Sequence, residues 1–505
     1  MAFNESKTLR RVVLTATAAA TLFGALQVLV AITARHGMTE VESIIASHAM
    51  MLSRGESLYW NLDQYPFTVS PYGPLLYSLE AVGVLLGAEP MSVGRAIAFA
   101  ALLAVIWLVY RIALIYTEDK RYAWTAALLA GGTANLISWG VIGQSDMPAL
   151  AFSVAAFERY STWRRDRRGA VLAWCGVLIA LSIFTKQSFL AAGATISLMV
   201  LMDDRRTGLK FVGLLAPAGG AMALLVNSLT GGYYFDNAIT ANLNPFAWDV
   251  LGLQLNYLVN ACGSLIVMAL AGWRYARSRE ARPLFAYLAA TAVIFFATSP
   301  KVGSDLNYQI ELVAVLSICA GWSLWKLELF DKLLARDKGL VTLLQLPLAL
   351  HLVVNCVADF RHAGARYVRD GERREQYAKL ERWVQPDAGR IVSVEIDPLL
   401  FAREGRIDVE PLIFSFLVDA GVADPEPVRQ DLENRAFSAL LLYHDLDETD
   451  PTKIDAGTPR LPPDHLRIVR ENYEMVEHVP GPFVGGIYVY TPKEEPLSAR
   501  SQIKP

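Results

Sequence analysis

Acidic, basic and amide side chains stand near the ends of long apolar runs in this sequence. Glu40 and Glu42 follow the first apolar run by a few residues. A positioned carboxylate can remove the proton of a hydroxyl nucleophile, and a fixed positive charge can stabilise a departing phosphate. The other candidates for such chemistry are Asp146 in "GQSDMPAL", Lys186 and Gln187 in "FTKQSF", Asn242 and Asn244 in "TANLNPF", and Lys301, Asp305, Asn307 and Glu311 in "SPKVGSDLNYQIE".

A structural role competes with a chemical one at several of these positions. Thr39 and Glu42 have the spacing of a capping box, in which the glutamate ties down the start of a helix. Glu40 has no comparable role, but residues two apart on a helix point in different directions, so both glutamates face one site only if the chain enters extended. Asp146 precedes a Met-Pro pair and could be a helix cap. Lys186 closes an apolar run and could snorkel to the membrane interface.

The composition indicates a membrane protein. Of 505 residues, 53% are hydrophobic and only 19% are charged, which is more apolar surface than a soluble core needs. Spanning about 30 Å of hydrocarbon takes roughly 20 apolar residues, and runs near that length recur from residue 12 to about residue 358. A net charge of −3 gives no basic surface for nucleic acid. The four cysteines have neither metal-binding nor redox spacing.

The pattern of basic loops sets the predicted topology. The expected spans are 12–34, 94–116, 122–142, 147–163, 169–185, 188–202, 209–229, 254–273, 283–299, 306–326 and 339–358. The segment 72–87 is ambiguous because it is short and contains Glu80. Short cytoplasmic loops are enriched in Lys and Arg, and the basic loops share that side only when 72–87 is not counted as a crossing. About eleven crossings then place the N-terminus in the cytoplasm and the C-terminal region outside.

This topology brings the polar candidates to the external face. Ionisable residues within a membrane are costly and therefore indicate function, so polar residues from distant loops at one face predict a shared site. In the first external loop, residues 35–93, the apolar spacing after Thr39 predicts an amphipathic helix along the membrane surface that ends at Gly55. Residues 359–505 contain charged clusters, Pro pairs and short alternating runs, which predict a separate soluble domain after a membrane domain of residues 1–358.

These motifs, taken in order, resemble the GT-C superfamily of integral-membrane glycosyltransferases. The resemblance rests on the acidic pair after the first span, "RGESLY", "SPYGPLLY", Arg95 at the start of the next span, "GQSDMPALAF", "FTKQSF" and "GSDLNYQIE". The nearest relatives by this pattern are glycosyltransferase family 39 and the bacterial aminoarabinose transferases. The resemblance covers roughly residues 10–330. The strand-like "GRIVSVEID", "FSALLLYHD" and "GGIYVYTP" resemble the small α/β domains that end many such enzymes.

The resemblance implies a polytopic α-helical membrane protein of GT-C type in the inner (plasma) membrane. It implies about eleven transmembrane helices, interfacial helices in the first external loop, and a C-terminal extracytoplasmic α/β domain. The implied function is transfer of a hexose or pentose from a polyprenyl-phosphate-linked donor to a glycan, lipid or protein acceptor in cell-envelope glycan synthesis, with inversion. Membrane lipids are the other expected partners, and no nucleic acid and no organic cofactor are expected.

The implied roles fall on particular residues. Glu40 or Glu42 is the expected general base, with Asp146 as a further catalytic residue, and Lys186, Lys301 and Arg95 are expected at the donor phosphate. Glu42 and Asp146 are the expected ligands of a divalent cation, Mg²⁺ or Mn²⁺. The expected substrate-binding residues are Tyr72, Gln187, Asn244, Asp305, Asn307 and Glu311.

A transporter or flippase of a lipid-linked glycan is the competing interpretation. Many spans and polar groups fit that class too. Transporters, however, tend to have internal repeats and broken helices that meet at the membrane midplane, and this sequence has neither a recognisable repeat nor midplane charges. The sequence therefore favours an enzyme.

Overall fold

A computed structural model describes most of the chain. The described residues are 26–31, 34, 36–242, 244, 246–333, 339–397, 407–454, 460–482 and 485–494, together with residues 15, 19, 22 and 24. The chain forms two compact units, each made of segments distant in sequence. Unit 1 comprises Met1–Ala34, Tyr72–Ser228 and Asn244–Tyr367, and unit 2 comprises Arg35–Pro71, Leu229–Leu243 and Val368–Pro505. The predicted span 12–34 lies mostly outside the described residues, and the predicted division at residue 358 stays a prediction.

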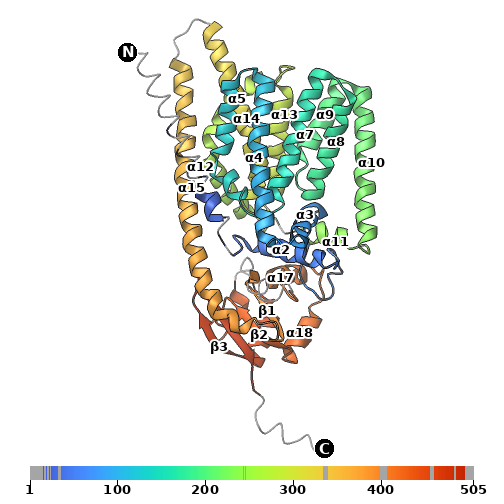
Figure 1. Cartoon of the computed structure of the whole chain (residues 1–505), viewed down its shortest axis with the longest axis vertical. Coiled ribbons are helices and arrows are strands. Elements are labelled where there is room, and N and C mark those ends of the chain that lie inside the picture. Colours follow the sequence, from blue (N-terminus) through green and yellow to red (C-terminus); the bar gives the residue numbers. More distant parts are fainter. Residues whose placement is uncertain are drawn as a thin grey trace, which may run out of the picture. The chain divides into compact units, whose positions relative to one another are not determined.

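Unit 1 is built from helices (Figure 1). They are α3 (Pro74–Leu85), α4 (Pro90–Thr117), α5 (Lys120–Gly131), α6 (Ala134–Trp139), α7 (Asp146–Asp166), α8 (Gly169–Thr185), α9 (Ala191–Asp203), α10 (Arg205–Leu229), α12 (Trp248–Gly272), α13 (Arg282–Thr298), α14 (Ile310–Leu333) and α15 (Gly339–Leu380), of which α15 continues into unit 2. The short 3₁₀ helices are η2 (Trp273–Tyr275) and η3 (Leu306–Gln309). A helix therefore covers most of each span predicted from residue 94 onward, except that the span 122–142 is divided between α5 and α6.

Small buried side chains let these helices pack closely. α4 packs against α5, α7 and α14, and α7 packs against α8 and α9. Ala98, Val105 and Val109 of α4 are fully buried. A β-carbon at Gly321 of α14 would lie 2.8 Å from the side chain of Ala126, so only glycine allows α14 and α5 to approach this closely.

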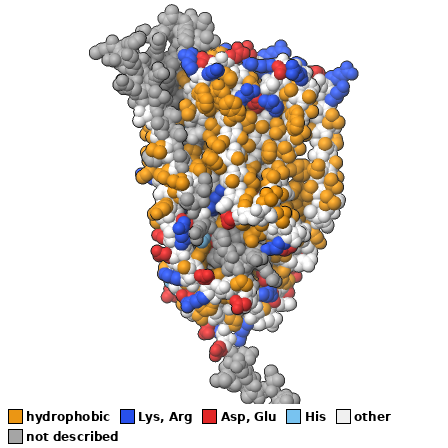
Figure 2. Space-filling model, in the orientation of Figure 1, with side chains coloured by type: hydrophobic (Ala, Val, Ile, Leu, Met, Phe, Trp, Pro, Cys, Tyr) orange, Lys and Arg blue, Asp and Glu red, His pale blue; other side chains and the backbone are white. Residues whose placement is uncertain are grey.

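The outer surface of unit 1 is apolar, as a lipid-facing surface must be. Hydrophobic side chains cover the helices in Figure 2. Among the described residues, four segments are long and apolar enough to cross a membrane: Pro90–Thr117, Arg205–Leu229, Trp248–Tyr275 and Leu306–Leu327. α3 has 12 residues, about 18 Å of helix at 1.5 Å per residue, which is too short for about 30 Å of hydrocarbon. The protein is a multi-pass membrane protein, although the count of eleven crossings stays a prediction.

The basic loops of unit 1 meet at one end. Arg165 pairs with Glu118 at 2.9 Å and Arg164 pairs with Asp203 at 3.0 Å. Arg164 also donates to the carbonyl oxygen of Arg279 at 2.9 Å. Four loops that are distant in sequence are thus joined, and Figure 2 shows Lys and Arg side chains gathered along the upper end. These basic loops therefore lie together at one end of unit 1, and the predicted topology, including the side of the membrane that this end faces, stays a prediction.

Unit 2 combines a small sheet with helices from the first loop and the C-terminal region. Its sheet has the order β1-β2-β4-β3, in which β1 and β2 are parallel and the other pairs are antiparallel. The strands are β1 (Arg390–Ser393), β2 (Phe437–Leu442), β3 (Tyr473–Val479) and β4 (Ile487–Pro492). The helices are α2 (Glu40–Ser53), α11 (Tyr234–Ala238), α17 (Pro411–Asp419), α18 (Glu426–Glu433) and α19 (Pro463–Asn472), with short 3₁₀ turns η1 (Thr240–Asn242), η4 (Glu381–Trp383) and η5 (Pro451–Lys453).

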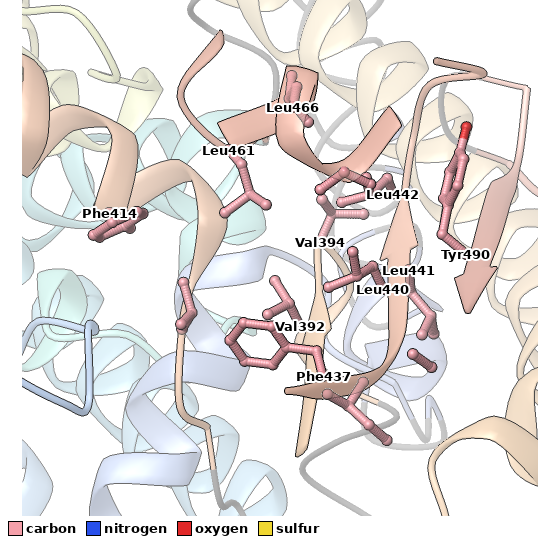
Figure 3. Packing of buried hydrophobic residues seen from close by; sticks show 14 of the residues in the cluster. Val392, Val394, Phe414, Phe437, Leu440, Leu441, Leu442, Leu461, Leu466 and Tyr490 are labelled. Atoms are coloured by element: carbon pink, nitrogen blue, oxygen red, sulfur yellow. The ribbon is translucent and has the colours of Figure 1, made fainter. Parts of the chain in front are cut away.

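The core of unit 2 includes residues of the first loop. Figure 3 shows Val392, Phe437 and Leu440 among the side chains packed around the sheet. Leu62 and Phe67 belong to the same buried cluster. The predicted strands in "GRIVSVEID", "FSALLLYHD" and "GGIYVYTP" are confirmed as β1, β2 and β4, whereas the sequence analysis did not predict β3.

The predicted helix after Thr39 is confirmed as α2. Its residues from Glu42 to Ala49 are all buried, including the polar Ser43, Ser47 and His48. The helix is therefore enclosed on all sides along this stretch, and the one-sided burial predicted from the apolar spacing is not observed. His48 contacts Thr68 and Ser70 at 3.1 and 3.0 Å, which satisfies a polar group that the apolar pattern ignored.

Candidate active site

A pocket in unit 1 contains four of the residues proposed from the sequence. Its lining residues are Asp146, Lys186, Ser188, Phe189, Thr291, Ile294, Phe295, Thr298, Asn307, Tyr308, Glu311 and Leu312. They come from the start of α7, the loop after α8, the end of α13, η3 and the start of α14. Most of these side chains are polar or charged, which suits a polar ligand.

A buried ion pair forms the polar centre of the pocket. The Lys186 ammonium lies 2.7 Å from Asp146 Oδ1, and the two side chains are only 5% and 2% exposed. Asp146 is the first residue of α7, where the N-terminal end of the helix dipole favours a negative charge. The other carboxylate oxygen, Oδ2, is buried without a hydrogen-bond partner among the described residues. A buried acceptor left in this state needs a donor, and a hydroxyl group of a ligand in the pocket would supply one.

Two aromatic rings flank the Lys186 ammonium. It lies 4.8 Å from the ring centre of Tyr72 and 5.3 Å from that of Tyr308, within the range of cation–π attraction. Desolvation raises the pKa of the Tyr72 phenol to about 12, so the hydroxyl stays protonated and can donate a hydrogen bond. Gly73 allows this arrangement, because a β-carbon there would overlap the carbonyl oxygen of Phe184.

Glu311 and Asn307 contribute further acceptors to the pocket. Glu311 Oε1 accepts hydrogen bonds from Ser153 Oγ at 2.5 Å and from Tyr287 OH at 2.7 Å. These two hydroxyls fix the carboxylate at the start of α14, where the sequence places it beside the pocket. Asn307 is buried, and its Oδ1 has no hydrogen-bond partner among the described residues. The pocket therefore holds acceptors aimed at a polar ligand next to one buried cation.

Three predicted residues stabilise the loop before η3. Asn244 donates to the carbonyl oxygen of Val302 at 2.9 Å. Asp305 caps η3 by accepting from the backbone N–H of Leu306 at 2.6 Å. Lys301 lies in a backbone bridge with Phe246. These contacts explain the polar density of this stretch as loop structure, and their predicted roles in substrate or phosphate binding stay predictions.

Arg95 and Gln187 lie at two other positions of unit 1. The buried Arg95 guanidinium donates to the carbonyl oxygens of Ala31 and Ala34, at 3.1 and 2.6 Å, which are acceptors at the end of the first helical stretch. Gln187 directly follows Lys186 and is partly buried. Neither residue is among those that line the pocket, and their predicted roles stay predictions.

The two glutamates of the first loop lie on α2 in unit 2. The backbone N–H of Glu42 donates to Thr39 Oγ1 at 3.2 Å, and Glu42 Oε2 accepts from the N–H of Met38 at 2.7 Å. The predicted capping role of Glu42 is confirmed, with Met38 instead of Thr39 as the backbone donor. Glu40 takes no part in this cap, and its Oε1 is buried without a hydrogen-bond partner among the described residues. The side chain of Glu40 is instead hydrogen-bonded to that of Glu410.

Sequence reasoning did not single out several pocket residues. Tyr308 lies inside a quoted motif, but only its acidic and amide neighbours were chosen. Thr291 and Thr298 are seven residues apart on α13 and therefore share one face of that helix, a spacing visible in the sequence. Gly73 carries no signal at all, because the close approach of Phe184 arises only from the packing of α8.

The chain resembles known proteins both in sequence and in fold. Residues 71–230 match the family model described as dolichyl-phosphate-mannose-protein mannosyltransferase. No curated protein matches the chain in sequence. ArnT from Cupriavidus metallidurans bound to undecaprenyl phosphate has a similar structure, with a TM-score of 0.59, 14% identity, and coverage of 93% of this chain and 97% of that chain. The apo state of ArnT has a TM-score of 0.60 and 14% identity, with coverage of 94% of this chain and 98% of that chain.

A second solved structure shares the fold over a part of its own length. The Archaeoglobus fulgidus oligosaccharyltransferase in the apo form has a TM-score of 0.52 and 14% identity, over 94% of this chain and 74% of that chain. Its complex with Zn and sulfate has a TM-score of 0.54 and 13% identity, over 94% of this chain and 73% of that chain. The partial family match and the shared fold together confirm the resemblance of this chain to the GT-C superfamily of membrane glycosyltransferases.

Proposed function

We propose that this protein transfers a sugar from a polyprenyl-phosphate-linked donor to an acceptor at the extracytoplasmic face of the membrane. The observation that carries the proposal is the buried pair of Lys186 and Asp146 in a pocket with unpartnered acceptors. The structure of ArnT that shares this fold is bound to undecaprenyl phosphate, which supports a donor of the same chemical class here.

Lys186 is the group best suited to the donor phosphate. When the bond between the anomeric carbon and the phosphate oxygen breaks, negative charge develops on the departing polyprenyl phosphate. An ammonium held in a water-poor pocket stabilises that charge without having to reorganise. Asp146 fixes the ammonium on one side, and the rings of Tyr72 and Tyr308 restrict it on the others. Lys301 and Arg95 remain further candidates for the same charge.

The sugar hydroxyls have matching acceptors in the pocket. Asp146 Oδ2 and Asn307 Oδ1 are buried without partners among the described residues, and the Glu311 carboxylate is held in the wall by two hydroxyls. A ligand hydroxyl would remove the cost of about 1–3 kcal/mol that each unsatisfied buried group carries. A hexose or a pentose both present such hydroxyls.

Glu40 is the better candidate for the general base. Glu42 is committed to the start of α2, whereas Glu40 has a carboxylate oxygen without a partner among the described residues. In the proposed step, the acceptor hydroxyl gives its proton to the Glu40 carboxylate and its oxygen attacks the anomeric carbon. The polyprenyl phosphate leaves from the opposite face with the bonding electron pair, so the configuration inverts, as in single-displacement glycoside chemistry.

A divalent cation finds no set of ligands among the described residues. No group of three or more His, Cys, Asp or Glu side chains there could hold a metal ion. Asp146 Oδ1 already pairs with Lys186 at 2.7 Å, and Glu42 accepts from Met38. The expected Mg²⁺ or Mn²⁺ stays a prediction, and no step of the reaction is derived through a metal.

The flippase alternative is less well supported. The chain matches a mannosyltransferase family model and shares its fold with a glycosyltransferase. A flippase also needs a path across the membrane, whereas the polar pocket lies at one end of the helices of unit 1.

The test measures both donor binding and transfer. The purified protein in detergent is titrated with undecaprenyl phosphate, and then incubated with undecaprenyl phosphate linked to glucose, mannose or arabinose and a cell-envelope extract as acceptor. A transferase releases undecaprenyl phosphate without a sealed membrane, and a flippase does not. Failure of all three donors to release undecaprenyl phosphate would refute the proposed function, whether or not the protein binds the carrier.

A further inference from the structure

The segment that carries Glu40 is held by side chains of the C-terminal region. Within unit 2, Asp397 Oδ2 accepts a hydrogen bond from the backbone N–H of Gly37 at 2.7 Å. Asp397 Oδ1 accepts from the hydroxyl of Ser43 on α2. Arg373 of α15 donates to the carbonyl oxygen of Gly37. One buried aspartate therefore fixes the chain on both sides of Glu40, three residues before it and three after it.

The chain passes very close to Ser43 and Asp397 at Gly37. A β-carbon at Gly37 would overlap the Ser43 hydroxyl and would lie 2.9 Å from Asp397 Oδ1, so glycine is needed for the chain to pass this closely. Ile396, the neighbour of Asp397, packs with Ile44 of α2 and Ile407 in a separate buried cluster. Polar and apolar contacts therefore fix the same turn of α2.

Glu395 and Asp397 occupy one edge of the sheet. They follow β1, and Tyr443 follows β2. Because β1 and β2 are parallel, their carboxyl ends meet at the same edge, where ligating loops of such sheets gather. Glu395 accepts hydrogen bonds from Tyr377 at 2.8 Å and from Tyr443 at 2.6 Å, which hold it in place beside Asp397.

Glu410 approaches Glu40 from a third direction. It caps α17 by accepting from the N–H groups of Leu412 and Ile413, at 3.1 and 2.5 Å. Its own N–H donates to the carbonyl oxygen of Phe67 at 2.9 Å, which joins α17 to the first loop. Burial raises the pKa of Glu410, and its side chain is hydrogen-bonded to that of Glu40, so one of these two carboxyl groups carries a proton.

Burial and the neighbouring acidic groups disfavour the ionised form of Glu40. Burial, followed by the negative charges of Glu410, Glu395 and Asp397, raises the pKa of Glu40 well above its ordinary value. The titratable and charged groups that surround this cluster among the described residues are His36, Glu42, Arg373, Tyr377, Glu395, Asp397, Glu410 and Tyr443. A base with a raised pKa binds the proton of an acceptor hydroxyl more strongly than an ordinary carboxylate does.

We propose that Asp397 and Glu410 are positioning residues through which the C-terminal region holds the general base Glu40 in its working geometry. This inference rests on the proposed function, in which Glu40 takes the acceptor proton. It gives the C-terminal region a part in the sugar transfer itself, separate from any binding of donor or acceptor.

The main variant is Asp397→Asn, with Asp450→Asn as its matched control. Asp450 caps η5 in the same unit, away from this cluster, by accepting from the N–H of Thr452 at 3.0 Å. A shift of about 1 Å in a catalytic group can cost about 100-fold in rate, so Asp397→Asn should lower kcat by about 10- to 100-fold. Its affinity for undecaprenyl phosphate should stay within about twofold of wild type, and Asp450→Asn should change neither quantity.

Glu395→Gln gives a readout that a purely structural role would not move. Glu395 is one of the groups that raise the pKa of Glu40, so its replacement should move the rising limb of the pH–rate profile to lower pH. Ser43→Ala removes the partner of Asp397 from the side of α2 and leaves every charge in place. It should lower kcat without moving that limb, and it serves in place of Asp397→Asn if that variant does not fold.

Different results would overturn the positioning role and the proposed function. Suppose that wild type transfers sugar, and that folded Ser43→Ala and Glu395→Gln keep the wild-type kcat and pH profile: the positioning role is then overturned and the proposed function survives. Suppose instead that wild type binds undecaprenyl phosphate but releases none from any donor: the proposed function fails, and the inference falls with it.

Discussion

Replacing Lys186 with methionine tests whether the buried ammonium binds the donor phosphate or serves only Asp146. At 2.7 Å the pair is almost completely buried. With an effective dielectric constant of about 20, the Coulomb attraction at that distance is about 6 kcal/mol. The net cost of removing one partner of such a pair is smaller, about 3–5 kcal/mol, and comes mainly from the charge left behind. Lys186→Met should therefore destabilise the protein through Asp146.

The double variant Lys186→Met/Asp146→Asn separates the two roles. It removes the stranded charge, so most of the lost stability should return in thermal unfolding measured in detergent. Binding of undecaprenyl phosphate should not return, because the cation is still missing. A hydrogen bond to a charged group contributes about 1.5–3 kcal/mol, which corresponds to affinity about 10- to 100-fold weaker. Lys210→Met, at an exposed position of α10, is the control and should bind like wild type.

Two results would contradict this reasoning. If both variants bind undecaprenyl phosphate as tightly as wild type, Lys186 is not a phosphate ligand and its role is confined to Asp146. If the double variant stays as unstable as Lys186→Met, the loss does not come from an unpaired Asp146 carboxylate.

Three further outcomes are expected. Gly73→Ala places a β-carbon on the carbonyl oxygen of Phe184 and should lower both thermal stability and sugar transfer. The control Gly219→Ala, at a position with open space around it, should be neutral or slightly stabilising. Equal effects of the two variants would contradict the packing argument. Glu42→Gln should retain transfer and Glu40→Gln should lose it, by at least about 100-fold as judged by release of undecaprenyl phosphate; the reverse order would make Glu42 the base. Because the pKa of Glu40 is raised in the folded state, the folded protein holds a proton that the unfolded protein loses. The stability of the wild type should therefore fall as pH rises from about 4.5. The melting temperature of Glu40→Gln should depend less on pH across that range.

The helices and their ends were predictable because their signals are local. Apolar runs and basic loops repeat along the chain, and each is readable within about 20 residues. The same is true of the capping role of Glu42, which depends only on Thr39 three residues earlier. Asp146 and Lys186 were predicted separately as polar residues at the same face, and the structure joins them at 2.7 Å.

The arrangement around Glu40 was not predictable, because it depends on residues more than 350 positions away. Asp397 and Glu410 carry no motif of their own and read as ordinary charges in a soluble region. Their importance appears only when the sheet and the first loop pack together. The strand β3 was missed for a different reason: its middle residues are exposed, so its pattern lacks the alternation that identifies a half-buried strand.

The buried position of Phe67 and Leu62 beside the sheet has a consequence for how the chain reaches its native state. These side chains leave the ribosome more than 300 residues before β1 does, so they must wait for most of the protein to be synthesised and inserted before they find their partners. Non-local assembly of this kind is slow, and the sheet cannot complete its interior earlier. A fragment that begins after the membrane helices would leave that interior open to water, and we expect it to aggregate unless residues 36–71 are supplied with it.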